Sequence, residues 1–155
     1  MRLSKNFVLS EIIRSNTAKR LNISNEPTKE HLHNMQMLIG DLIQPMRDDI
    51  GPIRISSGYR SKELNRAIGG STKSQHCKGE ALDLQFWFKG KMNNKVIYEW
   101  VLDSGLEFDQ MINEFDFAWI HISLKSKGNR KQVLEAYHDE DGDTKYRYAD
   151  VKPSI

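Results

Sequence analysis

The sequence predicts an α+β fold in which helices pack on one face of a central, mainly antiparallel sheet. Two observations lead to this prediction: patterns with helical spacing come first along the chain, and alternating strand patterns gather later. The chain has 155 residues, the usual size of one compact domain, and shows no repeat or linker. We therefore expect a single domain over residues 1–155, with a core from about 7 to 137 and a charged tail over 138–155.

The best-marked helix is an amphipathic one in the first third of the chain. Its apolar positions follow each other at steps of 3, 4, 3 and 4: Leu32, Met35, Ile39, Leu42 and Met46. Pro27 and Thr28 mark its start, Pro45 should kink or fray its last turn, and residues 51–52 (GP) end it. A shorter helix is predicted before it, with Ser10 as its N-cap.

The remaining elements follow from alternation and from turn residues. The patterns predict a strand at 53–56, a helix from the N-cap Ser61 to about 68, a loop over 71–80, a strand at 81–86, a helix at 94–105, and strands at 108–114, 118–124 and 131–137. The tail from 138 onward gives no prediction.

Composition and charge exclude several classes of function. Lys and Arg number 23 against 21 Asp and Glu, a balance too even for a nucleic-acid-binding surface. No segment approaches the roughly 20 apolar residues of a membrane span, so we expect no membrane insertion. The single cysteine, Cys77, allows no internal disulfide. The first residues do not form a secretory signal, so we expect synthesis in the cytoplasm, and we expect a monomer.

Three residues are candidate metal ligands. His76 and Asp83 lie seven positions apart, joined by a glycine-containing loop that enters a strand. His121 lies in a later strand, on the face opposite Ile120 and Ile122. Histidine nitrogens and carboxylate oxygens are common zinc ligands, and three of them leave the fourth coordination position of the ion open. Catalytic zinc sites have such an open position, where a bound water molecule has a pKa of about 7. Residue types alone leave open that these histidines bind no metal, and for His31, His33 and His138 a surface or hydrogen-bonded role is favoured.

The same region resembles a known family. The motif S-x-H-x-x-G-x-A-x-D, followed by W-x-H, is similar to the zinc D-alanyl-D-alanine carboxypeptidase family, which includes phage L-alanyl-D-glutamate endopeptidases and shares its fold with the hedgehog signalling domain. The resemblance spans about residues 7–137. Its matching positions are Ser74, His76, Gly79, Ala81 and Asp83, with further matches at 57–61 (SGYRS), 64–65 (LN), 68–70 (IGG) and 109–110 (DQ).

The resemblance implies roles for these positions. His76, Asp83 and His121 would bind zinc. Arg60 would bind a substrate carboxylate or stabilise an oxyanion, because a guanidinium donates two parallel hydrogen bonds. Ser74 would lie beside the substrate and orient a ligand or the loop.

The general base does not follow from the resemblance. Relatives carry a glutamate three residues before the last histidine, or a histidine two before it, and this chain has Ala118 and Trp119 there. A hairpin centred between 116 and 117 would place Glu114 opposite Trp119, on the face of His121 and roughly 7–8 Å from it. We therefore predict Glu114 as the base, with Asp116 next, although a shift of one residue would turn Glu114 to the other face.

The resemblance implies zinc-dependent hydrolysis of a peptide bond in peptidoglycan stem peptides, either as an endopeptidase or as a D,D-carboxypeptidase. It further suggests a phage or prophage enzyme of the endolysin type that acts on the cell wall after release. The alternative is a non-catalytic family member that retains zinc and serves as a phage structural or wall-binding protein. The departure at Ala118 keeps this alternative open.

Overall fold

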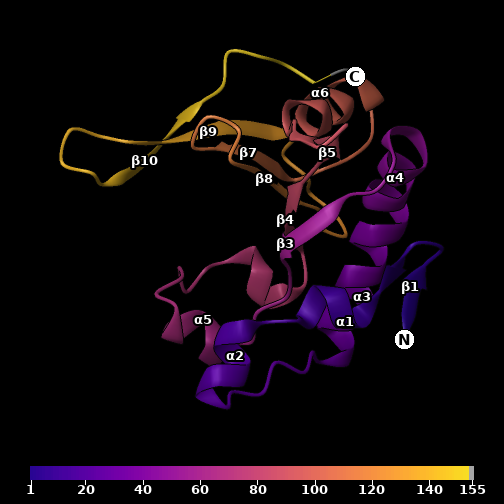
Figure 1. Cartoon of the computed structure of the whole chain (residues 1–155), viewed down its shortest axis with the longest axis vertical. Coiled ribbons are helices and arrows are strands. Elements are labelled where there is room, and N and C mark those ends of the chain that lie inside the picture. The colour runs from indigo at the N-terminus through magenta and orange to yellow at the C-terminus, as the bar shows by residue number, and fades with distance from the viewer. Residues whose placement is uncertain (154–155) are drawn as a thin grey trace.

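A computed structural model describes residues 1–153 of the chain (Figure 1). Its centre is a six-stranded sheet with the strand order β10-β9-β7-β8-β4-β3. Short helices and hairpins surround the sheet, together with a longer, interrupted helix near the N-terminus. The strands of the sheet are β3 (Arg54–Ser57), β4 (Ala81–Gln85), β7 (Gln110–Glu114), β8 (Trp119–Ser123), β9 (Gln132–His138) and β10 (Thr144–Tyr148).

The pairing of the strands confirms the predicted fold class. Every pair in the sheet is antiparallel except β7 and β9, which run parallel. The five predicted strands are present, each within two residues of its predicted start. The sheet is therefore mainly antiparallel, as the sequence indicates.

The sheet separates an apolar face from a polar one. Leu82 and Leu84 of β4 pair with Ile122 and Ile120 of β8, and all four side chains are buried in the main core. The next residues along each strand point to the opposite face. His121 is among them, so the candidate site lies on the face away from this core.

The interrupted helix supplies much of the core. It consists of α3 (Lys29–Leu38), a π-helical stretch (Ile39–Ile43) and α4 (Gln44–Ile50). The predicted start is confirmed, since the Thr28 hydroxyl accepts a hydrogen bond from the His31 amide. The predicted fraying at Pro45 is wrong, because the helix continues to Ile50, but the regular α-helix is interrupted just before Pro45 by the π-helical stretch. In a regular α-helix the proline ring would clash with the carbonyl group four residues earlier. The wider π-helical turns before Pro45 leave room for this ring.

The other helices are α1 (Leu9–Ile13), α2 (Asn16–Leu21), α5 (Lys62–Ala67), α6 (Lys95–Ser104) and a 3-10 helix (Gln75–Lys78) inside the segment predicted as a loop. Ser61 caps α5 as predicted. Ser10 is not the N-cap of α1, because the helix begins at Leu9 and its N-cap is Val8. Val8 has no capping hydroxyl, and its amide donates a hydrogen bond to the Glu11 carboxylate.

Two hairpins and the last strand were not expected from the sequence. The hairpins join β1 (Arg2–Ser4) to β2 (Phe7–Val8) and β5 (Trp87–Phe88) to β6 (Lys91–Met92). Strand β10, within the charged tail, pairs along its whole length with β9, and Figure 1 shows this hairpin extending from the sheet at the left. Within residues 1–153, no helix has the length and apolar character needed to cross a membrane.

Candidate metal centre

Three elements bring the predicted metal ligands together. His76 lies on the 3-10 helix, Asp83 on β4 and His121 on β8, and the last two are direct cross-strand partners. Asp83 Oδ1 is 3.3 Å from His76 Nε2 and 3.1 Å from His121 Nδ1. One ligand atom from each residue lies within 4.8 Å of the others. The three side chains therefore converge on one point.

The backbone orients the His76 ring. His76 Nδ1 lies 2.8 Å from the carbonyl oxygen of Gly58, which can only accept a hydrogen bond. Nδ1 therefore donates to this carbonyl, and Nε2, which contacts Asp83 Oδ1 in the metal-free protein, is the nitrogen that would bind a metal. A second hydrogen bond of this kind is the usual way in which proteins hold a metal-binding histidine in one tautomer.

Electrostatics keeps the central carboxylate ionised. Burial by itself raises the pKa of Asp83, but hydrogen bonds from His121 and His76 outweigh it and hold that pKa well below its usual range. An ionised carboxylate between two imidazoles is a suitable donor set for zinc. Because the donors converge and the Gly58 carbonyl holds the His76 ring with Nε2 toward Asp83, the residues present fit a zinc ion.

Glu114 lies on the same sheet face, at the predicted position. It pairs with Trp119, and its neighbour two residues back, Ile112, pairs with His121. The side chain is only 8% exposed. Burial raises the pKa of Glu114 to about 7, while His121 acts to lower this pKa and the negative charge of Asp83 acts to raise it. A carboxyl group with such a pKa can both accept and release a proton near neutral pH.

The turn after Glu114 holds this register in place. Phe115, Asp116 and Phe117 all have positive φ angles, of 52°, 56° and 64°, which non-glycine residues rarely adopt. The Asn113 side chain accepts a hydrogen bond of 2.6 Å from the Phe117 amide. Asn94 donates to the Phe117 carbonyl at 2.8 Å. These contacts compensate for the unfavourable backbone and prevent a shift of the hairpin.

Arg60 and Ser74 reach the same cleft, a cavity of about 870 Å³ that is also lined by the three metal ligands and Glu114. Arg60 Nη2 lies 3.5 Å from Ser74 Oγ, while its buried Nε has no hydrogen-bond partner among the described residues. Ser74 Oγ accepts a hydrogen bond from the His76 amide. Ser74 thus stabilises the 3-10 helix that carries His76, and the Arg60 guanidinium lies beside it in the cleft.

Other candidate residues lie outside this group. Asp116, the second choice for the base, lies in the turn and lines a separate, smaller hollow. His31 Nδ1 is 3.0 Å from the Tyr59 hydroxyl, and the His138 ring stacks on Phe115. Cys77 is buried and is not among the described residues that line the cleft. The hydrogen bond of His31 agrees with the role predicted for it, and Asp116 is not among the described residues that line the cleft.

A buried ion pair behind the site was missed by sequence reasoning. Asp109 is fully buried, and its Oδ2 accepts hydrogen bonds from Arg130 at 2.8 Å and from Gln75 at 3.1 Å. The network ties the residue next to His76 to the loop before β9. The 109–110 segment was noted as a match to the family, but only the fold reveals its partners.

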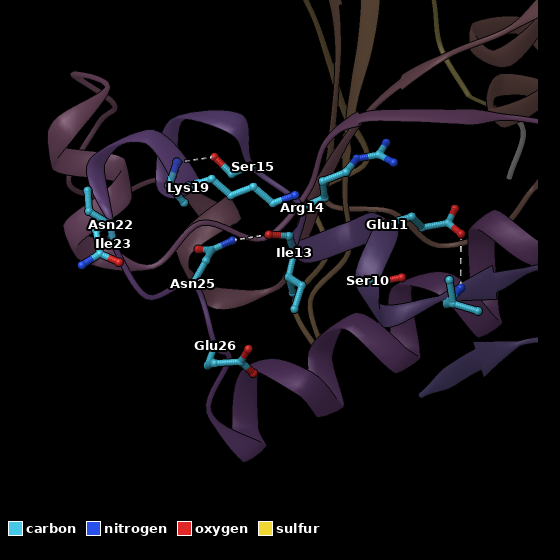
Figure 2. Close-up of a pocket in the computed structure, with 12 residues that line it drawn as sticks. Ser10, Glu11, Ile13, Arg14, Ser15, Lys19, Asn22, Ile23, Asn25 and Glu26 are labelled. Atoms are coloured by element: carbon cyan, nitrogen blue, oxygen red, sulfur yellow. Dashed lines mark hydrogen bonds between the residues drawn. The ribbon is translucent and has the colours of Figure 1, made fainter.

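A second hollow, of about 750 Å³, lies between α1, α2 and the segment that ends at Glu26 (Figure 2). Three of its polar side chains, those of Glu11, Ser15 and Asn25, bind backbone groups. The Asn25 amide, for example, donates to the Ile13 carbonyl at 2.7 Å. None of the described residues that line it is a histidine or a cysteine.

Comparisons with known proteins agree with this geometry. A family model described as peptidase M15 matches residues 5–123. The matched segment contains Arg60, Ser74, Glu114 and the three metal ligands and ends before β9 and β10. The search of curated proteins gave no significant match. Because the family model covers most of the chain, the resemblance inferred from the motifs is confirmed, and the chain belongs to the peptidase M15 family.

Proposed function

We propose that this protein is a zinc metallopeptidase that hydrolyses a peptide bond in the stem peptides of peptidoglycan. The observation that carries the proposal is the position of Glu114: it shares a sheet face and a cleft with His121 and Asp83 and has a pKa near neutrality. Membership of a peptidase family supports the reaction type.

His76, Asp83 and His121 would hold the metal. When bound, zinc would act as a Lewis acid that polarises a carbonyl group and lowers the pKa of a water molecule. Glu114, as a carboxylate, accepts a proton from the attacking water and then donates it to the leaving amine. Arg60, which lines the cleft, donates hydrogen bonds to the oxyanion or to a substrate carboxylate through its terminal nitrogens.

The charge of the cleft supports an acidic peptide as substrate. Arg60, Lys73 and Arg130 all line it, although Arg130 is already paired with Asp109. Peptidoglycan stem peptides carry free carboxylates, which basic side chains bind. Both an L-alanyl-D-glutamate endopeptidase and a D,D-carboxypeptidase fit this description. A phage origin, a monomeric state and action on the wall after release stay predictions of the sequence analysis.

Digestion of purified peptidoglycan tests the proposal. Wild-type protein should release peptides, a chelator should stop the release, and added zinc should restore it. Glu114→Gln should lower kcat about 100- to 10,000-fold, the usual contribution of a general base, while zinc binding stays intact. Glu135→Gln is the matched control, since Glu135 lies on the neighbouring strand β9 but on the other face, beside Arg147.

Mass spectrometry of the products identifies the bond that is cut, because each product ends at the cleaved position. Full activity in the presence of a chelator would contradict the metal mechanism. A zinc-loaded protein that binds peptidoglycan and releases no product would instead support the non-catalytic alternative.

A further inference from the structure

The β9–β10 hairpin adds a wall to the cleft from outside the segment that the family model matches. Leu134 of β9 and Thr144 and Tyr146 of β10 line the same cavity as the metal ligands. The matched segment ends at residue 123, before either strand begins. The shape of this side of the cleft is therefore a property of this chain's C-terminal part.

Tyr146 belongs to a row of cross-strand partners that ends at the candidate base. Tyr146 pairs with Ala136, Ala136 pairs with Glu114, and Glu114 pairs with Trp119. Two strand spacings, about 10 Å, separate the backbones of Tyr146 and Glu114. Ala136 lies between them and is a small, buried residue. The Glu114 and Tyr146 side chains line the same cavity, one on each side of this small residue.

The hydroxyl of Tyr146 is available as a donor. The side chain is 54% exposed, and no described residue accepts a hydrogen bond from it. The nearby Tyr148 hydroxyl, in contrast, accepts a hydrogen bond of 3.3 Å from the side-chain amide of Gln132. Partial burial and the negative charges of Glu114 and Asp83 raise the pKa of Tyr146, so the phenol keeps its proton at neutral pH.

A peptide bound over Glu114 needs such a donor. Its carbonyl oxygens lose water when they enter the cleft, and an oxygen without a new partner weakens binding. On the β4 side the metal ligands and Arg60 line the cleft. On the β9–β10 side the hydroxyls of Thr144 and Tyr146 line it, and Tyr146 is the one in the row of Glu114.

We propose that Tyr146 contacts the substrate and that its hydroxyl donates a hydrogen bond to a carbonyl oxygen of the peptide lying over Glu114. This assignment rests on the proposed function. It makes the C-terminal hairpin part of the substrate site and not only a stabilising edge of the sheet.

Tyr146→Phe removes only the hydroxyl and tests the assignment directly. The variant should lower kcat/KM for stem-peptide hydrolysis about 10- to 100-fold, with unchanged zinc content and unchanged melting temperature. Tyr137→Phe is the matched control. Tyr137 lies on the opposite face of the same hairpin, where its ring packs against the Arg147 guanidinium, 4.5 Å from the centroid. This control should keep wild-type kinetics.

A binding measurement separates this proposal from the proposed function. Titration of a synthetic stem peptide into metal-free Glu114→Gln protein requires no catalysis. Adding Tyr146→Phe to this protein should weaken the peptide Kd about three- to tenfold, the usual effect of one lost hydrogen bond. If the wild type hydrolyses nothing, the proposed function fails, and this titration still tests Tyr146.

Two results would overturn the assignment. One is a Tyr146→Phe protein that equals the wild type in kinetics and in peptide binding, even if Tyr146→Ala is impaired, because the ring and not the hydroxyl would then matter. The other is a loss of activity that accompanies an equal loss of zinc or of thermal stability.

Discussion

Asp83 Oδ1 is the atom around which the candidate metal centre is arranged. A nitrogen of His76 and a nitrogen of His121 each lie within 3.3 Å of it, and the two rings meet edge to face with centroids 5.1 Å apart. The Gly58 carbonyl accepts a hydrogen bond from the His76 ring, and His121 is positioned by its place in strand β8. Metal binding would replace the contacts to Asp83 with little movement.

Glu114 makes the metal-free protein sensitive to pH. Its pKa in the folded state is about 7, above the ordinary value of 4.5, so the folded protein holds this proton more tightly than the unfolded chain does. Stability therefore falls as pH rises from about 4.5 to 7 and stays reduced above that range. The difference of the two pKa values corresponds to about 3 kcal/mol at most.

Glu114→Gln should remove this pH dependence. In the presence of a chelator, we expect the variant to exceed the wild type in free energy of unfolding at pH 8 by up to ~3 kcal/mol. The gain should shrink below pH 5, where the wild-type carboxyl is protonated. Urea unfolding at both pH values measures the difference. An equal effect at pH 5 and pH 8 would show that Glu114 has an ordinary pKa.

At the scale of elements, α1 and the segment after β3 must touch closely for His76 to be oriented. A Cβ atom at Gly58 would lie 2.2 Å from the Ile12 carbonyl oxygen, and the next amide, Tyr59, donates a hydrogen bond to that same oxygen at 2.9 Å. Only glycine permits this approach. The Gly58 carbonyl that orients His76 is thus positioned by helix α1.

Gly58→Ala should therefore damage both stability and metal binding. We expect a loss of about 1–3 kcal/mol in the free energy of unfolding from the clash, and a zinc affinity reduced about 10- to 100-fold as the acceptor of His76 Nδ1 moves away. Denaturant unfolding and zinc titration measure the two effects.

Gly40→Ala is the matched control for this substitution. Gly40 is an exposed helical glycine, and a Cβ atom added there would meet no other atom within 4 Å. Alanine at this position should therefore stabilise the protein by about 0.5–1 kcal/mol. Equal behaviour of the two alanine variants would contradict the role given to the contact between Gly58 and α1.

At the scale of the whole molecule, the centre joins parts of the chain that lie far apart in sequence. The 3-10 helix, β4 and β8 each contribute one ligand, and the Asp109 network fastens the 3-10 helix to the loop before β9. The unfolded chain cannot hold these ligands together. A metal that binds the folded state should therefore stabilise the entire domain.

Zinc should raise the melting temperature accordingly. At a free concentration of 100 times Kd, the gain is about 2.7 kcal/mol, or roughly 5–10 °C for a domain of this size. His121→Ala should abolish the shift. His33→Ala, at an exposed position on α3, should keep it. Calorimetry with and without zinc measures it, and a shift that survives in the His121 variant would exclude the proposed centre.

The sequence alone determined the parts of this protein that depend on local pattern. The period of apolar residues predicted the long helix and the central strands, and the motif around His76 and Asp83, with His121, predicted the metal ligands. Symmetry about the turn at 116–117 was enough to place Glu114 opposite Trp119, because a hairpin's register follows from its turn.

The tertiary structure decided what depends on contacts between distant segments. The Gly58 carbonyl behind His76, the buried pair of Asp109 and Arg130, and the row of Tyr146, Ala136 and Glu114 join residues that no sequence period relates. The tail carries too little apolar pattern to predict a strand, and it forms one because the free edge of β9 offers unpaired backbone groups. The residues of the candidate metal centre can thus be predicted from sequence motifs, whereas the walls of the cleft form only when distant segments of the chain pack together.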